Sequence, residues 1–137
     1  MKQDSAITNI TQAIGNTPLL RIKSLSEACG SDIYAKCENL NPGGSIKDRA
    51  ALQMITDAQQ QGIITPGYHI IEGTAGNTGI GLALVCKALG YKMTVVMPKG
   101  QDPGKEMWLR LYGAEVKLVD PVPFTNENHF FHTARRM

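Results

Sequence analysis

Runs of apolar residues along this chain switch between the two-residue spacing of strands and the three-to-four-residue spacing of helices. In the strand-like stretches, apolar residues alternate with polar ones or form short runs bounded by glycine, proline or asparagine. The stretch at residues 32–38 alternates regularly and is typical of a half-buried strand. Strands are therefore predicted at residues 19–22, 32–38, 68–72, 91–97 and 114–119.

Helical spacing fills most of the intervals between these strands. Apolar residues recur at that spacing after Ser45, a good N-cap residue, and Asp48 stands where a capping-box acid would. Gly62 is a suitable C-terminal stop for this helix. Further helices are predicted at residues 80–89, 105–112 and 126–137. The 80–89 helix is apolar almost all round, which predicts that it is well buried.

The alternation of strands and helices predicts an α/β fold, a parallel sheet with helices on both faces. The 137 residues suffice for one domain with a hydrophobic core. The last predicted helix runs to residue 137 without a glycine or asparagine cap, and a closed domain rarely ends in that way. We therefore expect an incomplete fold, in which residues 1–137 form the N-terminal part of a longer protein and its C-terminal half is absent.

Composition narrows the class of protein. Hydrophobic residues make up 42% and charged residues 19%, as in ordinary globular domains. The net charge of +2, with no basic stripe, argues against binding to nucleic acid. The apolar runs are too short to span a membrane, and residues 1–5 lack the apolar core of a secretion signal. Three widely spaced cysteines form no disulfide pattern and no metal-binding pair, so we expect a cytoplasmic protein without a metal site.

The first candidate functional residue is Lys47. It lies at the predicted start of a helix, in the run 41–49, NPGGSIKDR. A cation at this end opposes the helix dipole, so chance seldom favours a lysine there. The same placement favours a neutral amine, which can form an imine with an aldehyde. The alternative is an ordinary surface lysine with Asp48 and Arg49 as solvated neighbours. The two glycines before it let a ligand approach the backbone, which favours the functional interpretation.

A second motif, GTAGNTG at residues 73–79, follows a predicted strand and opens a helix. Unpaired N–H groups and the helix dipole suit such a turn to an anion, although the glycines could also serve only the bend. The dinucleotide pattern GxGxxG and the P-loop pattern are not met, which disfavours a nucleotide-binding domain. An imine-forming lysine with an anion-binding turn suggests a site for pyridoxal 5′-phosphate (PLP). Physical reasoning alone assigns the turn to the cofactor phosphate.

The runs 41–49 and 72–81, together with IGNTPL at residues 14–19, resemble the cysteine synthase and cystathionine β-synthase family. The resemblance covers nearly the whole chain and is strongest to cysteine synthase. It implies the fold of the fold-type II PLP enzymes, which is similar to that of the tryptophan synthase β-subunit. It also implies a homodimer for the full-length family.

The resemblance implies a role for each matching residue. Lys47 aligns with the lysine that binds PLP covalently and acts in catalysis, and Asn77 aligns with the asparagine that hydrogen-bonds the 3′-oxygen of PLP. The family's loop for the substrate carboxylate aligns with Thr74, Ala75, Gly76 and Thr78. The resemblance thus reassigns the anion at this turn from the cofactor phosphate to the carboxylate of an amino-acid substrate.

The implied reaction is β-replacement on PLP, which serves as an electron sink. An activated serine such as O-acetylserine loses its α-proton to Lys47 and then its β-substituent, sulfide adds, and L-cysteine is released. The chain departs from many family members at Gly73 and Ala75, where those members have proline and serine. A subgroup of cysteine synthases resembles this chain in the whole run.

Three alternatives to cysteine synthesis stay open. Serine and threonine dehydratases eliminate instead of replacing, and they tend to carry histidine at the position of Thr78. Cystathionine β-synthase takes homocysteine in place of sulfide. The third alternative is a truncated, non-catalytic remnant, because the family's loop for the PLP phosphate belongs to the second half of the enzyme. We therefore expect this chain alone to bind PLP weakly and to be a poor enzyme.

Overall fold

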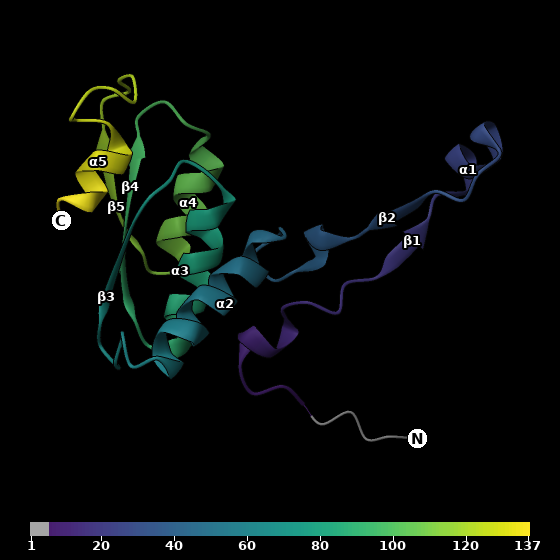
Figure 1. The fold of residues 1–137 in the computed structure, drawn as a ribbon, viewed down its shortest axis with the longest axis horizontal. Coiled ribbons are helices and arrows are strands. Elements are labelled where there is room, and N and C mark those ends of the chain that lie inside the picture. The colour runs from purple at the N-terminus through teal and green to yellow at the C-terminus, as the bar shows by residue number, and fades with distance from the viewer. Residues whose placement is uncertain (1–5) are drawn as a thin grey trace.

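The computed structural model describes residues 6–137, so the expectation that concerns residues 1–5 lies outside the described residues. Figure 1 shows a body of helices and strands from which a slender arm projects. The arm and its base contain the 3₁₀ helices η1 (Ile10–Ala13) and η2 (Glu38–Leu40), and β1 (Leu19–Arg21), α1 (Lys23–Cys29) and β2 (Tyr34–Lys36). The body contains α2 (Lys47–Gln60), β3 (His69–Gly73), α3 (Asn77–Leu89), β4 (Lys92–Pro98), α4 (Pro103–Leu111), β5 (Glu115–Val119) and α5 (Phe130–Arg135).

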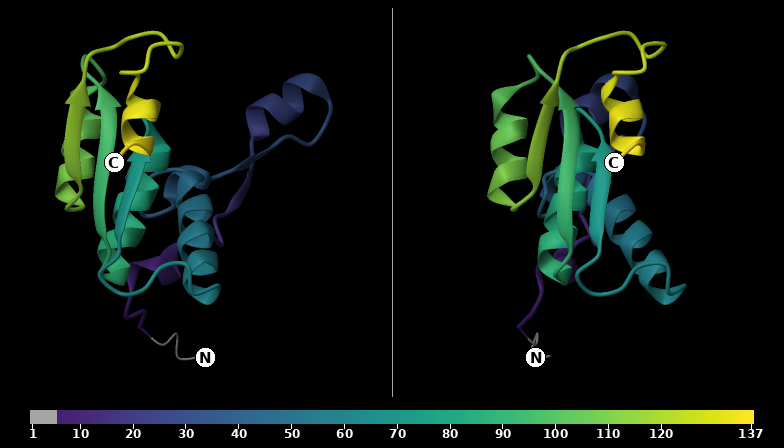
Figure 2. Two further views of the ribbon diagram at one scale, coloured as in Figure 1. Left: turned by 60° about the vertical axis from the view of Figure 1, so that its left-hand side comes forward. Right: turned by 90° about the vertical axis from the view of Figure 1, so that its left-hand side faces the viewer.

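The body is built around a parallel three-stranded sheet in the order β3-β4-β5. The central strand β4 pairs with both neighbours, and Gly73 lies opposite Val96 where β3 leads toward α3. Helices α3 and α4 cover one face of the sheet, and α5 lies on the other (Figure 2). The predicted architecture, a parallel sheet with helices on both faces, is confirmed.

The hydrophobic core lies between the sheet and α3. Val85 of α3 and Val95 of β4 are fully buried, and every α3 residue from 79 to 86 is buried. The prediction of a well-buried helix is therefore confirmed. Burial raises the pKa of the Cys86 thiol to about 11, so this residue stays protonated at neutral pH and packs as a small apolar side chain.

The first two predicted strands do not join the parallel sheet. They form a separate antiparallel pair in which Leu19 lies opposite Lys36 and Arg21 lies opposite Tyr34. The chain reverses between them through α1, which the sequence did not predict, and the reversal leaves the two strands antiparallel. The pair extends away from the sheet in the arm (Figure 1).

The start of α2 differs in detail from the prediction. The helix begins at Lys47, and its N-cap is Ile46, which makes no side-chain capping bond. Ser45 was predicted as the cap, and its Oγ instead accepts a hydrogen bond from the Lys47 N–H at 3.2 Å. Asp48 is not a capping-box acid, because its carboxylate turns away from the cap and accepts a hydrogen bond from the Gly43 N–H.

Other helix ends follow the sequence more closely. Gly62 follows α2 and Gly90 caps α3, both with positive φ, as the predicted stops require. Helix α3 begins at Asn77, earlier than predicted, and α5 is shorter than the predicted 126–137 helix because the residues before Phe130 form turns. No helix within residues 6–137 is both long enough and apolar enough to cross a lipid bilayer.

Helix α2 packs closely along α3 at Gly81. A Cβ at this position would lie 3.0 Å from both the carbonyl carbon and the carbonyl oxygen of Lys47. These are backbone atoms, which no side-chain rotation can move aside. Glycine inside a helix costs roughly 1 kcal/mol relative to alanine, so the close approach of α2 is the physical reason for glycine here.

We predict that Gly81→Ala destabilises the chain. The added methyl group forces α2 and α3 apart, at a cost of about 1–3 kcal/mol that exceeds alanine's gain in helix propensity. Urea unfolding followed by circular dichroism measures the change. Gly76→Ala is the matched control, because a Cβ there meets no atom within 4 Å. Equal unfolding midpoints for the two variants would contradict the packing argument.

Candidate functional site

The two sequence motifs meet where α2 lies against α3. Gly81 lies on the Lys47 backbone, and Asn77 and Thr78 stand four and three residues before Gly81, so they share its face of α3. The structure thus packs the Lys47 backbone against α3 one turn after Asn77 and Thr78, which brings the two motifs together.

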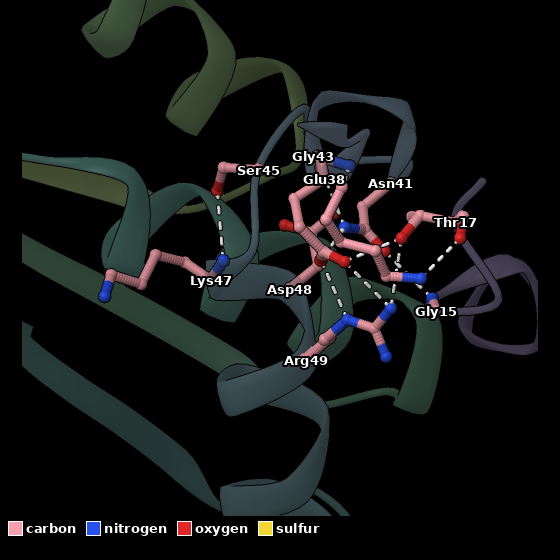
Figure 3. Close-up of polar contacts among 10 residues, drawn as sticks. Gly15, Thr17, Glu38, Asn41, Gly43, Ser45, Lys47, Asp48 and Arg49 are labelled. Atoms are coloured by element: carbon pink, nitrogen blue, oxygen red, sulfur yellow. Dashed lines mark hydrogen bonds and ion pairs between the residues drawn. The ribbon is translucent and has the colours of Figure 1, made fainter. Parts of the chain in front are cut away.

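Lys47 is the first residue of α2, and its side chain is exposed. In Figure 3 this side chain extends away from the polar residues that gather around Asp48 and Arg49. The placement at a helix start agrees with the sequence prediction. The amine is accessible to a bound molecule and is not consumed by the polar contacts that hold the turn.

Thr74 organises the glycine-rich turn. Its N–H donates to the Val96 carbonyl at 3.0 Å, which continues the pairing of β3 with β4. Its hydroxyl accepts a hydrogen bond from the Gly76 N–H at 3.3 Å. A Cβ at Gly79 would lie 2.7 Å from the Thr74 methyl group, so that methyl packs on the first turn of α3. Thr74 therefore fixes the turn itself, in addition to any contact with a ligand.

Gly76 is the N-cap of α3, and its glycine is not explained by the chain around it. The backbone is extended, with φ −138° and ψ −160°, a conformation open to any residue. A Cβ would meet no atom within 4 Å. Open space therefore lies at the N-terminus of α3, where the first N–H groups have no partner within the helix. This combination suits an anion that approaches the backbone closely.

A cleft of about 480 Å³ opens beside the two motifs. The segment 39–44 lines one part of it, and Lys105, Trp108 and Tyr112 line it from α4 and the residue after it. Asn77 and Ile80 contribute from α3. Of the predicted site residues, Asn77 lines this cleft, and Lys47, Thr74, Ala75, Gly76 and Thr78 are not among its lining residues.

A polar cluster centred on Glu38, which the sequence analysis missed, holds the chain before Lys47 (Figure 3). Glu38 accepts hydrogen bonds from Arg49 at 2.8 Å and 3.0 Å, and from the Thr17 hydroxyl at 2.6 Å. The Asn41 amide donates to the same carboxylate at 2.9 Å. These bonds, those from Arg49 first, lower the pKa of Glu38 from 4.5 to about 2. Glu38 thus ties three separate segments together.

A second set of contacts clamps the 41–44 turn between α2 and α4. Asp48 is fully buried, and a Cβ at Gly43 would collide with its carboxylate. Burial raises the pKa of Asp48, and the hydrogen bond from the Gly43 N–H opposes that rise. The Tyr112 hydroxyl, at the end of α4, donates to the Pro42 carbonyl at 3.3 Å. The turn is therefore positioned from both sides.

Comparison with known proteins decides the family. The family of pyridoxal-phosphate dependent enzymes matches residues 10–136. The chain belongs to this family. Cysteine synthase 1 of Emericella nidulans is 55% identical over 130 residues, which cover 95% of this chain and 35% of that protein. Cysteine synthase of Staphylococcus aureus is 48% identical over 113 residues, which cover 82% of this chain and 36% of that protein. The chain spans about a third of the length of these relatives.

Solved structures of the family share the fold. An O-ureido-L-serine synthase matches with a TM-score of 0.87 and 33% identity, over 96% of this chain and 41% of its own. A hydrogen sulfide-producing enzyme from Fusobacterium nucleatum matches with a TM-score of 0.84 and 37% identity, over 99% of this chain and 43% of its own. The expected fold-type II PLP architecture, and the resemblance to cysteine synthases, are thus confirmed.

The residues present fit the cofactor of the family. PLP carries an aldehyde, and Lys47 offers an accessible amine at the start of α2. Asn77 lines the cleft with an amide that can donate to or accept from a ring oxygen. Gly76 leaves open space beside the α3 N-terminus, which no side chain of the described residues fills. These groups fit the aldehyde and the ring oxygen of PLP, which are part of what the cofactor needs.

We predict that Glu38→Gln lowers stability in a pH-dependent way. Because the pKa of Glu38 falls from 4.5 to about 2 on folding, its stabilising effect is fully present above pH 4.5 and is lost as the pH falls toward 2. The difference in unfolding free energy between the wild type and Glu38→Gln should therefore be constant near neutral pH and vanish at low pH. Urea midpoints measured across this range test it.

Asp32→Asn serves as the control for that experiment. Asp32 forms an ion pair with Arg21 at 2.7 Å, and both side chains are exposed. Pairs of this kind contribute little to stability, so the control should track the wild type across the pH range. A Glu38→Gln variant that behaves like Asp32→Asn would show that the cluster does not hold the fold.

Proposed function

We propose that this chain provides the lysine and the substrate loop of a PLP-dependent enzyme that makes L-cysteine from an activated serine, O-acetylserine, and sulfide. The proposal is carried by the contact at Gly81, where the Lys47 backbone packs on α3 one turn after Asn77 and Thr78. In the proposal, the lysine amine, the Asn77 amide and the N-terminus of α3 act on one bound molecule. That is the set of groups needed to hold an aldehyde cofactor and the carboxylate of an amino acid.

Lys47 has two tasks in the proposal. Its Nζ binds PLP covalently, and the same atom, once released, takes the α-proton of the substrate. When bound, PLP supplies the electron sink for the resulting negative charge. The accessible position of the amine at the first residue of α2 supports both tasks. No polar partner has to be displaced before the amine can move between them.

The turn before α3 is proposed to bind the substrate carboxylate. The N–H groups of residues 77 and 78 and the Thr78 hydroxyl are the donors, and the α3 dipole favours a negative charge there. Ala75 contributes only its backbone, because it has no hydroxyl. Asn77 is proposed to hydrogen-bond the 3′-oxygen of PLP from the edge of the cleft. These residues are proposed to raise the reaction rate by orienting the substrate.

The names of the relatives support the choice of substrate and acceptor. Relatives at 55% and 48% identity are cysteine synthases. One structural neighbour is named for O-ureido-L-serine and another for producing hydrogen sulfide, and both names fit a serine derivative and sulfide. The complete activity, and a homodimer, are proposed for a protein of the relatives' length. For the 137-residue chain alone, the proposed step is covalent binding of PLP at Lys47.

We predict that Lys47 is the lysine that PLP modifies. The purified chain is mixed with PLP and reduced with borohydride, and the modified peptide is located by mass spectrometry. Lys47→Ala should abolish the specific label, because the substitution removes the amine at the start of α2. Lys105→Ala is the control, since Lys105 lines the neighbouring cleft. A label that persists in Lys47→Ala, or is lost in Lys105→Ala, would overturn the assignment.

We predict a second, separable effect at the substrate loop. Thr78→Ala should leave labelling of Lys47 unchanged but weaken the binding of O-acetylserine about 10-fold, the loss expected for one hydrogen bond to a charged group. The spectral response of the PLP-loaded chain to increasing O-acetylserine gives the affinity. Thr65→Ala, an exposed turn residue, is the control. Unaltered affinity in Thr78→Ala would place the carboxylate elsewhere. In a protein of the relatives' length, sulfide and homocysteine tested in turn as acceptors distinguish cysteine from cystathionine synthesis.

A further inference from the structure

The start of α2 is anchored by the two residues that follow Lys47. The N-cap Ile46 makes no side-chain capping bond, and the Lys47 N–H donates only within its own turn, to Ser45 Oγ at 3.2 Å. Contacts from outside the turn reach Asp48, through the Gly43 N–H, and Arg49, through Glu38. The place of Lys47 in space therefore depends on its backbone contact with Gly81 and on how its two neighbours are held.

We propose that Glu38 and Arg49 are positioning residues, whose ion pair sets the place and orientation of Lys47 at the start of α2. This inference rests on the proposed role of Lys47 in binding PLP. The pair touches neither the cofactor nor the substrate in this proposal. It acts through the two peptide units that join Lys47 to Arg49.

The geometry of the pair restricts orientation as well as distance. Arg49 donates through Nε to one oxygen of Glu38 at 2.8 Å and through Nη2 to the other at 3.0 Å. Two parallel bonds from a planar guanidinium fix both partners, which a single lysine contact would not do. The Glu38 side chain is 16% exposed and that of Arg49 is 39% exposed, so the carboxylate, more than the guanidinium, is shielded from solvent.

The anchor is itself held from other elements. Thr17 and Asn41, which are 7% and 3% exposed, both donate to the Glu38 carboxylate. The Asn41 Oδ1 accepts a hydrogen bond from the Gly15 N–H at 2.8 Å, and Arg49 Nη2 also donates to the Thr17 hydroxyl at 3.3 Å. The carboxylate thus has four hydrogen bonds from three side chains. A carboxylate held by four hydrogen bonds has little freedom to follow a shift of α2.

The pair and the reactive amine lie on different sides of the helix start. Figure 3 shows Lys47 extending away from the Glu38 cluster, while Arg49 points into it. A molecule bound at Lys47 therefore leaves the pair intact. Loss of the pair should let the first turn of α2 shift, and small displacements of a reacting group reduce rates strongly.

The test compares Glu38→Gln and Arg49→Lys with Ile55→Val, a buried α2 residue outside the cluster that controls for general loss of stability. Amide hydrogen exchange at residues 43–48 is measured without cofactor, and borohydride trapping of PLP at Lys47 is measured separately. In both cluster variants we expect exchange at residues 43–48 to be about 10-fold faster than in Ile55→Val. We also expect trapping at Lys47 to be about 10-fold slower, with trapping at Lys105 unchanged.

Each outcome decides one of the two claims. Exchange at residues 43–48 that matches Ile55→Val in both cluster variants would overturn the positioning role, whatever happens to trapping. Trapping that matches Ile55→Val despite faster exchange would also overturn it, because Lys47 would then not depend on the anchor. A wild-type chain that is not trapped at Lys47 refutes the proposed function instead, and the exchange result still decides whether the pair fixes this turn.

Discussion

The approach of α2 to α3 at Gly81 is the constraint on which the rest of the candidate site depends. Helix α3 is buried against the sheet and has little exposed surface of its own. Helix α2 packs against it where the missing side chain of Gly81 admits the Lys47 carbonyl. Since Asn77 and Thr78 lie on that same face of α3, one packing contact determines which groups can surround a ligand.

Polar contacts of Asp48 and Arg49 also hold the start of α2. A lysine at the first position of α2 opposes the helix dipole, but the next residue, Asp48, is an acid that the dipole stabilises. Burial of that acid raises its pKa, and the hydrogen bond from the Gly43 N–H offsets part of this cost. Arg49 then reaches the Glu38 cluster. Lys47 therefore stays accessible, while Asp48 and Arg49 connect the start of α2 to the residues before it.

The sequence predicted most of the body of the fold but only the two strands of the arm. Periodicity revealed α3 and the strands around it because their apolar residues are buried between the helix and the sheet. Helix α1 and the antiparallel pairing of β1 with β2 were not predicted, since most of these residues are exposed in the described structure and burial imposes little pattern on them. The cap of α2 was misplaced because a glycine and a buried acid, rather than Ser45, define the turn.

In the candidate site too, features formed by neighbouring residues were predicted from the sequence, and a contact between distant residues was not. Lys47 and the turn at residues 73–79 stand out because helix starts and glycine-rich turns are local features of sequence. The Glu38–Arg49 pair does not, because the two residues lie on different elements and no periodicity connects them. Its signal was present inside the run 41–49, where Arg49 was weighed only as a solvated neighbour. Folding, not spacing, brings the two side chains together.

The glycines of GTAGNTG illustrate why a motif cannot be interpreted as a unit. Gly73 admits α5, because a Cβ there would lie 2.8 Å from Phe131 Cα and 3.0 Å from the Phe130 carbonyl oxygen. The proline that many family members carry at this position would therefore require α5 to move outward. Gly79 makes room for the Thr74 methyl group. Gly76 alone of the three meets no neighbour and has ordinary backbone angles. Glycine is a favoured N-cap residue, and here its lack of a side chain also leaves the start of α3 open to a ligand.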